Sequence, residues 1–480
     1  MLYRSVLLFT VSCATVMSSF ALGETPTSWP QFRGRNSSGL ALPEEKLPEE
    51  IGPDKNVVWK VPLPPGHSSP ILHGKQIYVT AQEDKKLYTI GLRRRDGKEL
   101  WRQEAPIGKI EEIHDIGSLA QPTPVTDGER VISFFGSFGL LCYDINGKLL
   151  WERPLGPFNN TFGAGTSPIL ADDRIILCQD HDTDSFLMAL DKNTGNTLWV
   201  TDRSEFPRNY CTPVVWESGG QKQIVVAATL RAVGYDLASG NETWTVHGLS
   251  RAVCMTPVVG PKGILYIAGW AGGGDIGASV NVDLYETAVV NLDKNKNGSF
   301  EADEVPEGHP FHRRFVQVDR DKTGSITQQE YEYYKGLFDA ARNVVLAVRP
   351  GGKDDITESH VLWQSRKLVP FCSSPLYMNG LLFTIKDKGI LASREIRKGT
   401  IVKQGRVKAS GSYYSSPIGG DGKVYLIDQR GRLTVISAQG QWEILSTADF
   451  NEDVYATPAI AASRIYLRTD GHLYCFATKA

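Results

Sequence analysis

Short apolar runs separated by polar turns recur along most of this 480-residue chain, and each is introduced by a small residue followed by proline. The successive prolines are 54, 44, 45, 44, 118, 42 and 41 residues apart. A fixed spacing of this kind predicts a repeated structural unit. The runs are short and are bounded by turn residues, so they predict β-strands rather than helices. The introducing pairs are Ser69-Pro70, Thr123-Pro124, Ser167-Pro168, Thr212-Pro213, Thr256-Pro257, Ser374-Pro375, Ser416-Pro417 and Thr457-Pro458.

Each unit follows one plan of three strands, a glycine turn and a fourth strand that carries tryptophan. Four short strands in about 43 residues are typical of a propeller blade, so eight units predict an all-β, eight-bladed β-propeller. The last unit lacks its fourth strand, and the run Asn56–Lys60 near the N-terminus carries Trp59. We expect this run to complete the last blade and close the ring. The tryptophans expected to pack between blades are Trp101, Trp151, Trp199, Trp244, Trp363 and Trp442.

The spacing of 118 residues marks an insertion in the fifth blade. It begins after Trp270, between the second and third strands of that blade, and its helical spacing of apolar residues predicts a small α-helical module. The expected domains are a signal peptide at 1–23, an N-terminal leader at 24–55, the propeller at 56–270, the insertion at 271–343, and the rest of the propeller at 344–480.

Two twelve-residue stretches in the insertion have the register of EF-hand calcium loops. They are Asp293–Glu304 (DKNKNGSFEADE) and Asp319–Glu330 (DRDKTGSITQQE). Oxygen-bearing side chains stand at loop positions one, three, five, nine and twelve, with glycine at six, and calcium takes six to eight such oxygens. The expected calcium ligands are Asp293, Asn295, Asn297, Ser299, Glu301 and Glu304 in loop one, and Asp319, Asp321, Thr323, Ser325, Thr327 and Glu330 in loop two.

The alternative for both loops is an acidic turn without metal. The neutral hydroxyls of Thr323 and Thr327 predict weaker calcium binding by loop two than by loop one. Phe300 and Ile326, each at loop position eight, should pair in a short strand between the loops. Only residues 305–318 separate the loops, and Pro306 shortens the helix that would leave loop one. This compact arrangement favours a structural pair over a sensor.

Composition and the N-terminus indicate an exported protein. The formal net charge is −2, and no basic stripe indicates a nucleic-acid partner. Arg4 and the apolar run from Val6 to Leu22 predict a signal peptide cleaved before Glu24, and no later run is long enough to cross a membrane. Removal of Cys13 with that peptide leaves six scattered cysteines, which is typical of a fold that needs no disulfides in a bacterial periplasmic or extracellular setting.

The small-residue–proline starts and closures such as DKNTGNTLW (Asp191–Trp199) resemble the pyrroloquinoline-quinone-like β-propeller repeat family. The opening Trp29-Pro30-Gln31-Phe32-Arg33-Gly34 is similar to the leader of exported members. The resemblance implies two functional relatives: quinoprotein alcohol dehydrogenases, and the propeller of the outer-membrane protein assembly machinery. The dehydrogenases use a pair of adjacent cysteines and a CxxCH haem motif, and this sequence has neither.

Loops that precede the first strand of each blade should gather at one mouth of the ring and bind an unknown protein or small molecule. No catalytic residue can be assigned, so the sequence favours a calcium-binding scaffold or binding protein over an enzyme. A quinone-dependent oxidoreductase, with pyrroloquinoline quinone as cofactor, and an outer-membrane assembly factor stay open as alternatives. The expected mouth residues are His67, His114, Asp115, Asn159, Asn160, Arg208, Asn209, Tyr210, Arg251, Tyr413, Tyr414 and Tyr455, and Cys211, Cys254 and Cys372 should approach the channel.

Overall fold

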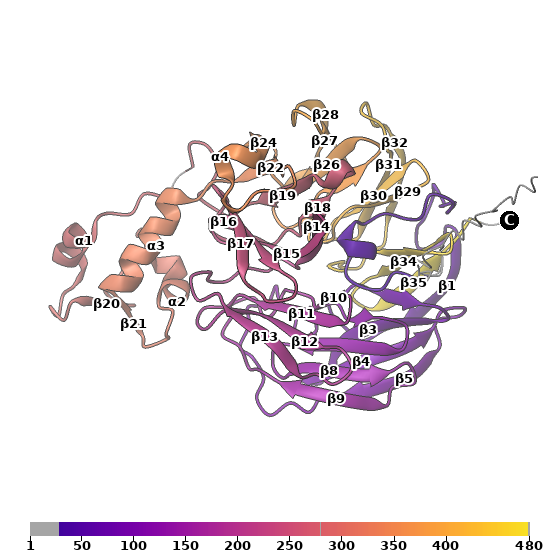
Figure 1. The fold of residues 1–480 in the computed structure, drawn as a ribbon, viewed down its shortest axis with the longest axis horizontal. Helices are drawn as coiled ribbons and strands as arrows, with labels where there is room; N and C mark the ends of the chain where they lie inside the picture. Colours follow the sequence, from indigo (N-terminus) through magenta and orange to yellow (C-terminus); the bar gives the residue numbers. More distant parts are fainter. Residues whose placement is uncertain (1–27, 279, 479–480) are drawn as a thin grey trace, which may run out of the picture.

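The described chain forms a ring of eight antiparallel sheets, with a helical module projecting from one side (Figure 1). The structure is a computed structural model that describes residues 28–278 and 280–478, so the signal peptide predicted at 1–23 lies outside the described residues. Each sheet contains four strands of a blade. The predicted eight-bladed β-propeller is therefore confirmed.

The first four blades follow one another along the chain, and the sheet of blade four gains a fifth strand. Blade one is β2 (Ile71–His73), β3 (Gln76–Glu83), β4 (Lys86–Arg93) and β5 (Glu99–Glu104); blade two is β6 (Val125–Thr126), β7 (Arg130–Phe135), β8 (Gly139–Asp144) and β9 (Leu149–Pro154); blade three is β10 (Ile169–Ala171), β11 (Arg174–Gln179), β12 (Phe186–Asp191) and β13 (Thr197–Asp202); blade four is β14 (Val214–Ser218), β15 (Gln221–Ala227), β16 (Arg231–Asp236) and β17 (Glu242–His247), with β23 (Asp354–Asp355) paired parallel to β17.

The other four blades include the one that carries the insertion and the one that closes the ring. Blade five is β18 (Val258–Val259), β19 (Leu265–Gly269), β22 (Val344–Val348) and β24 (Val361–Ser365); blade six is β25 (Leu376–Met378), β26 (Leu381–Lys386), β27 (Ile390–Glu395) and β28 (Ile401–Arg406); blade seven is β29 (Ile418–Gly420), β30 (Lys423–Ile427), β31 (Arg432–Ser437) and β32 (Ile444–Asp449); blade eight is β33 (Ala459–Ala461), β34 (Arg464–Arg468), β35 (His472–Phe476) and β1 (Val57–Pro62). Short helices between strands are η1 (Arg35–Ser37), η2 (Pro261–Gly263), α4 (Thr357–His360) and η4 (Asp387–Gly389).

The two ends of the propeller meet in blade eight. Strand β1 pairs antiparallel with β35, with Trp59 opposite Cys475 and Val61 opposite Leu473. The outer strand of the last blade thus comes from the N-terminal part of the chain, as the run at Asn56–Lys60 predicts. Because β1 and β35 pair with one another, the first and last strands of the propeller belong to one sheet, and the ring is closed.

A belt of hydroxyl groups joins the inner ends of the blades. The residue before each blade's proline is Ser or Thr, and its hydroxyl oxygen accepts a hydrogen bond from the backbone N–H of the same position in the preceding blade. Seven of these bonds form, at 3.0–3.1 Å. The bond from Thr457 N–H to Ser69 Oγ joins blade eight to blade one. Within the described chain, the buried Thr256 Oγ1 has no hydrogen-bond partner, and it belongs to the blade that carries the insertion.

Tryptophan side chains connect the outer parts of neighbouring blades. In five blades the Trp Nε1–H donates to a backbone carbonyl in the turn before the fourth strand of the next blade, at 2.8–3.1 Å. The indole also covers a glycine of that turn, and a Cβ on this glycine would lie within 3.0 Å of the indole. These bonds confirm the expected packing between blades for the following tryptophans: Trp59, Trp101, Trp151, Trp199 and Trp363.

Two tryptophans depart from this pattern. Trp244 donates to Gln223 Oε1 of its own blade at 2.8 Å, because Trp216 on β14 takes its place and donates to Gly263 O of blade five at 2.7 Å. Trp442 precedes β32 and packs back on blade six, where a Cβ on Gly405 would lie 2.8 Å from the indole. Blade six has no tryptophan on its own fourth strand, and Trp442 covers the space.

The N-terminal leader crosses the end of the ring. Trp29 exchanges backbone hydrogen bonds with Leu72 of blade one, at 2.8 and 2.9 Å. The buried Arg33 donates through Nη2 to Pro375 O of blade six at 2.8 Å, and Asn36 donates to Val215 O of blade four at 2.8 Å. Burial lowers the pKa of Arg33 to about 9. The leader thus contacts blades one, four and six, which lie on different sides of the ring axis. It therefore covers this end of the central channel.

The insertion lies between β19 and β22 of blade five and contains most of the helix in the described residues. Its buried side chains, among them Phe300, Ile326 and Tyr331, form a small hydrophobic core of their own. The elements of the insertion are α1 (Tyr285–Leu292), β20 (Ser299–Glu301), η3 (His312–Arg314), α2 (Phe315–Val318), β21 (Ser325–Thr327) and α3 (Gln328–Ala340).

The hydroxyl belt predicts a difference between two chemically identical substitutions. In Thr457→Val, the buried Ser416 N–H loses its acceptor, and we expect a loss of about 1–3 kcal/mol in the free energy of unfolding. In Thr256→Val, the removed hydroxyl accepts no hydrogen bond in the described chain, and the expected change is within about 0.5 kcal/mol. Urea unfolding of both variants measures the difference, and equal losses would contradict a role for the belt.

Candidate functional site

Loop one folds around the carboxylates of Asp293 and Glu304. Asp293 accepts backbone N–H bonds from Asn297 (3.1 Å) and Gly298 (2.8 Å). Glu304 accepts from the backbone of Lys294 (2.8 Å), Asn295 (3.2 Å) and Glu301 (3.1 Å). The first and last residues of the loop therefore face one another, with the backbone wrapped around them.

The other predicted ligands of loop one lie on the same inner side. Asn295 Nδ2 donates to Glu301 Oε2 at 3.0 Å, and Asn297 Nδ2 donates to Glu301 Oε1 at 2.8 Å. Asn297 Oδ1 accepts from the backbone N–H of Ser299 at 2.8 Å. Loop one thus brings all six predicted ligand residues into one hydrogen-bonded loop.

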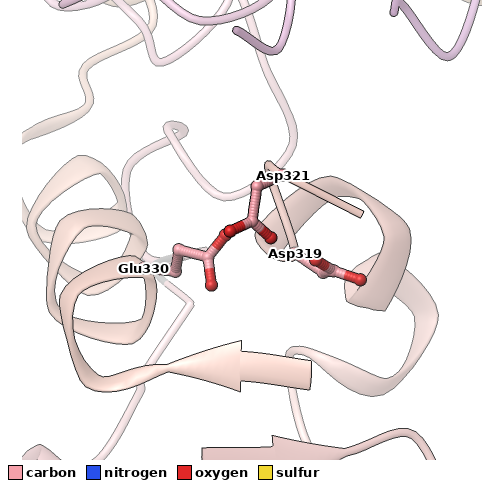
Figure 2. A group of neighbouring side chains, drawn as sticks. All are labelled: Asp319, Asp321 and Glu330. Carbon is pink, nitrogen blue, oxygen red and sulfur yellow. The ribbon is translucent and has the colours of Figure 1, made fainter. Parts of the chain in front are cut away.

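Loop two brings three carboxylates close together. One carboxylate oxygen each of Asp319, Asp321 and Glu330 lies within 4.8 Å of the others, and Figure 2 shows Glu330 and Asp321 turned toward one another. Asp319 accepts from the backbone of Thr323 (3.0 Å) and Gly324 (2.9 Å), as Asp293 does in loop one. Burial raises the pKa of Asp319, against the smaller opposing effect of these two N–H groups. Like charges at this separation repel unless a cation or protons neutralise them.

The neutral ligands predicted in loop two have internal partners. Thr323 Oγ1 donates to the carbonyl of Ser325 at 3.3 Å. Thr327 donates to Glu330 Oε2 at 2.8 Å and caps α3, where it accepts from the Glu330 N–H. A Thr327 hydroxyl committed to helix capping is a less available ligand than the aspartates.

A two-stranded sheet holds the loops in a fixed relation. Strands β20 and β21 pair antiparallel with Phe300 opposite Ile326, which confirms the predicted pairing. Both side chains are buried, and the Phe300 ring packs against Tyr331 of α3 with ring centres 5.4 Å apart. The donor set of each loop consists of carboxylate, amide, hydroxyl and backbone oxygens, which suits a hard cation such as Ca²⁺ and contains no sulfur or imidazole.

A cavity of about 570 Å³ lies on the propeller axis. Its wall includes, from every blade, the residue three positions before the blade's proline, and most hydroxyl residues of the belt. Phe32 of the leader reaches it from one end, and Gln317 of α2 reaches it from the insertion. The residues contributed by blades one to eight in turn are His67, Gln121, Gly165, Tyr210, Cys254, Cys372, Tyr414 and Tyr455.

Two guanidinium groups lie in the wall of this cavity. Arg208 pairs with Asp182, but its Nη1 is buried and has no hydrogen-bond partner in the described chain. Arg251 donates from Nε to Gly272 O at 3.3 Å and lies over the Phe338 ring; no carboxylate of the described residues pairs with it. Burial, and then repulsion from Arg314, lower the pKa of Arg251 to about 10, so it stays charged at neutral pH.

The imidazole of His67 adds no charge to the cavity. His67 stacks on Tyr455 with ring centres 3.8 Å apart, and burial with repulsion from Arg468 lowers the pKa of His67 to about 3. Arg251 therefore carries an uncompensated positive charge in the cavity wall, beside Arg208, which is paired with Asp182.

Loop two contacts the residues that orient Arg208. Arg320, the second residue of the loop, donates from its backbone N–H to Glu330 Oε1 at 2.7 Å. Its guanidinium donates to the carbonyls of Asp182 (3.2 Å) and Ser204 (3.3 Å). Since the Asp182 carboxylate binds Arg208, a continuous path of polar contacts joins loop two to the cavity wall.

The structure brings together some of the predicted mouth residues and not others. Sequence reasoning missed further lining residues, among them Gln121, Phe162, Trp270, Gln317 and Phe371. Two of these had a usable signal, since Gln121 stands three residues before the proline of blade two and Phe371 directly precedes Cys372. Cys254 and Cys372 line the cavity as expected, whereas Cys211 is buried behind it. The predicted residues that line it are His67, His114, Arg208, Tyr210, Arg251, Tyr414 and Tyr455; those that do not are Asp115, Asn159, Asn160, Asn209 and Tyr413.

Comparisons with known proteins agree with the repeat pattern. A family model described as "PQQ_2: Outer membrane protein assembly factor BamB" matches residues 51–161 and 89–252. These residues span β1 and blades one to four, so this part of the ring carries BamB-like repeats. No curated protein matches the chain.

Solved structures share the fold at low sequence identity. BamB from Moraxella catarrhalis is 14% identical with a TM-score of 0.57, and the match covers 88% of this chain and 97% of that chain. Sqt1 from Saccharomyces cerevisiae is 9% identical with a TM-score of 0.54, covering 92% and 98%. A quinohemoprotein alcohol dehydrogenase from Comamonas testosteroni is 14% identical with a TM-score of 0.48, covering 95% and 82%. These likenesses concern the fold alone, and the third is too weak to support an argument.

The helices of the described residues are all too short or too polar to cross a membrane.

A buried carboxyl group near the cavity predicts a dependence of stability on pH. Glu111 belongs to the loop that also carries His114, and burial raises its pKa to about 7, against smaller effects of the Phe158 amide and the Ser137 hydroxyl. The folded protein therefore holds a proton that the unfolded chain releases above its own pKa near 4.5. Stability from this group is present below that value and is lost as pH rises through about 7.

We expect Glu111→Gln to remove this loss. Relative to the variant, the free energy of unfolding of the natural protein should fall by about 2–3 kcal/mol between pH 5 and 8. The neighbouring Glu112 is exposed, so Glu112→Gln should follow the natural protein. Urea unfolding at several pH values measures the three curves, and parallel curves for all three would contradict a buried, proton-holding Glu111.

Proposed function

We propose that this protein is an exported calcium-binding β-propeller that acts as a binding or scaffold protein. Calcium would be held in two EF-hand loops of the insertion, and a partner would bind at the positive cavity on the ring axis. The observation that carries the proposal is the set of three converging carboxylates, Asp319, Asp321 and Glu330, within a loop of EF-hand register.

The donor geometry of both loops supports calcium as the ion. In loop one Asp293, Asn295, Asn297, Glu301 and Glu304 would supply side-chain oxygens, and Ser299 a backbone carbonyl. In loop two Asp319, Asp321 and Glu330 would supply carboxylates, with Thr323, Ser325 and Thr327 as weaker or backbone donors. The ion would neutralise the clustered carboxylates and hold both ends of each loop together. Its role is structural, and no chemical step depends on it.

The path from loop two to the cavity supports a link between calcium and partner binding. Glu330 accepts the Arg320 N–H, and a calcium ion bound to Glu330 would restrict the movement of this segment. Arg320 in turn contacts the carbonyl of Asp182, whose carboxylate orients Arg208. Calcium at loop two would therefore fix the position of a guanidinium in the cavity wall.

The chemistry of the cavity supports an acidic partner. The Nη1 of Arg208 is buried without a partner in the described chain, and a carboxylate is the group that best satisfies a guanidinium. Aromatic side chains such as Tyr210, Tyr414 and Trp270 offer apolar contact beside the charge. A carboxylate-bearing side chain of a partner protein, or a small organic acid, meets both requirements. The family match to an outer-membrane protein assembly factor favours the protein partner.

An exported location fits the expected calcium affinity. Extracellular calcium modules bind with dissociation constants of about 10⁻⁴–10⁻³ M, and calcium outside the cytoplasm is on the order of millimolar. Sites of this strength would stay largely filled there. The signal peptide proposed at 1–23 would direct the chain to such a compartment.

Substitution of the last residue of each loop tests the calcium sites. The natural protein should bind two calcium ions, and Glu304→Gln or Glu330→Gln should weaken one site about tenfold or more while leaving the other, because each removes a carboxylate ligand. Glu307→Gln removes the same charge from an exposed position between the loops and should leave both sites unchanged. Isothermal titration calorimetry measures all four proteins. Full binding by both loop variants would contradict the ligand assignment.

Substitution of the cavity arginines tests the binding surface. With 2-naphthoate as probe, saturation-transfer NMR should detect binding to the natural protein and little binding of the neutral 2-naphthamide. Arg208→Gln and Arg251→Gln should each weaken naphthoate binding about tenfold, whereas Arg397→Gln, at an exposed position on blade six, should not. Equal binding of acid and amide would contradict an acidic ligand, and it would leave the calcium sites as a separate question.

A further inference from the structure

Two cysteines occupy equivalent positions in neighbouring blades. Cys254 stands three residues before Pro257 of blade five, and Cys372 stands three residues before Pro375 of blade six. The backbones at these positions are joined by the belt, since Thr256 N–H donates to Ser374 Oγ at 3.0 Å. The repeat geometry therefore places the two thiols side by side across the seam between the blades.

The thiols touch one another and face the cavity. The Cys372 side chain interacts with that of Cys254, and both residues line the cavity on the propeller axis. Both are partly exposed, in contrast to the other four cysteines of the described chain, which are buried. The buried cysteines are Cys142, Cys178, Cys211 and Cys475.

The surroundings keep the Cys372 thiol protonated. The interaction with the Cys254 side chain and then burial raise the pKa of Cys372 well above its usual value. Tyr414 and Tyr210 line the same cavity as the two thiols. A high pKa makes a thiol slow to react at neutral pH, and it favours thiol chemistry that proceeds faster at alkaline pH.

We propose that Cys254 and Cys372 form a modification site at which the two thiols close to a disulfide across the seam between blades five and six. The oxidant is the disulfide of a small thiol. The thiolate of one cysteine attacks this disulfide, forms a mixed disulfide and releases one small thiol. The second cysteine then attacks the mixed disulfide at the protein sulfur and releases the other small thiol. Two protein thiols are oxidised, and one disulfide is reduced to two thiols.

The bond would join the two ends of the segment that contains the insertion. Residues 254–372 include β18, β19, the helical module, β22 and β24, so the disulfide closes this whole segment into one covalent loop. Cys254 also lies three residues after Arg251, so the bond forms in the wall that carries the cavity's charge. This site does not depend on calcium or on an acidic ligand.

Peptide mapping of the oxidised protein tests the proposal. The full mature chain is incubated, folded, with oxidised glutathione at mildly alkaline pH, and is then digested without reduction. We expect one linked peptide that joins Cys254 to Cys372, with a mass two hydrogens below the sum of its parts. The number of thiols that react with a thiol reagent after denaturation should fall by two, and dithiothreitol should restore them.

Two variants make the result specific. Cys254→Ser should give no linked peptide and should carry glutathione on Cys372, while Cys211→Ser, which removes a buried thiol in blade four, should give the same linked peptide as the natural protein. Circular dichroism checks that both variants are folded. The proposal is overturned if the folded natural protein acquires only glutathione adducts, does not react at all, or links either cysteine to Cys211.

Discussion

The closure of the ring is the constraint on which the rest of this structure depends. In most blades the inner strand has three residues or fewer, and so short a strand forms few hydrogen bonds with its neighbour. Its position is fixed by the hydroxyl belt, in which every Ser or Thr except Thr256 binds the N–H of its neighbour, and by β1, which joins the N-terminal part of the chain to β35. Together these contacts set the distance of every blade from the axis.

Because the belt fixes the blades, the residues just before it are held in a circle. This circle is the wall of the cavity, and it is built from side chains of very different chemistry: an imidazole, an amide, two thiols and three phenols. The leader covers one end, with Phe32 at the cavity and Arg33 bound to carbonyls of the blades. The insertion adds Gln317 at the wall and, through Arg320, contacts the pair of Asp182 and Arg208. The hydrogen-bonded centre of the ring thus presents a charged, aromatic surface beside a module that carries two loops of EF-hand register.

The sequence contained enough local information for the blades and for the loops. The proline starts, the tryptophans and Trp59 predict eight blades and their closure, and the register of Asp293–Glu304 predicts which side chains face inward. Contacts between distant residues could not be predicted in this way. Trp244 departs from the repeat because Trp216 takes its place in the contact with the next blade. Trp442 departs because blade six has no tryptophan on its own fourth strand. The path from Arg320 to Asp182 and the contact of Cys254 with Cys372 depend on the packing of segments more than a hundred residues apart, which no local pattern encodes.

The central claim is that calcium in the insertion and the cavity of the ring are physically connected. Hydrogen–deuterium exchange with and without calcium, followed by peptide mass spectrometry, tests it directly. The account predicts that calcium slows exchange in residues 293–330 and also in residues 180–184 and 203–210, where Asp182 and Arg208 lie, with no change in blades seven and eight. Protection confined to the insertion would contradict the connection, and the absence of any protection would contradict calcium binding itself.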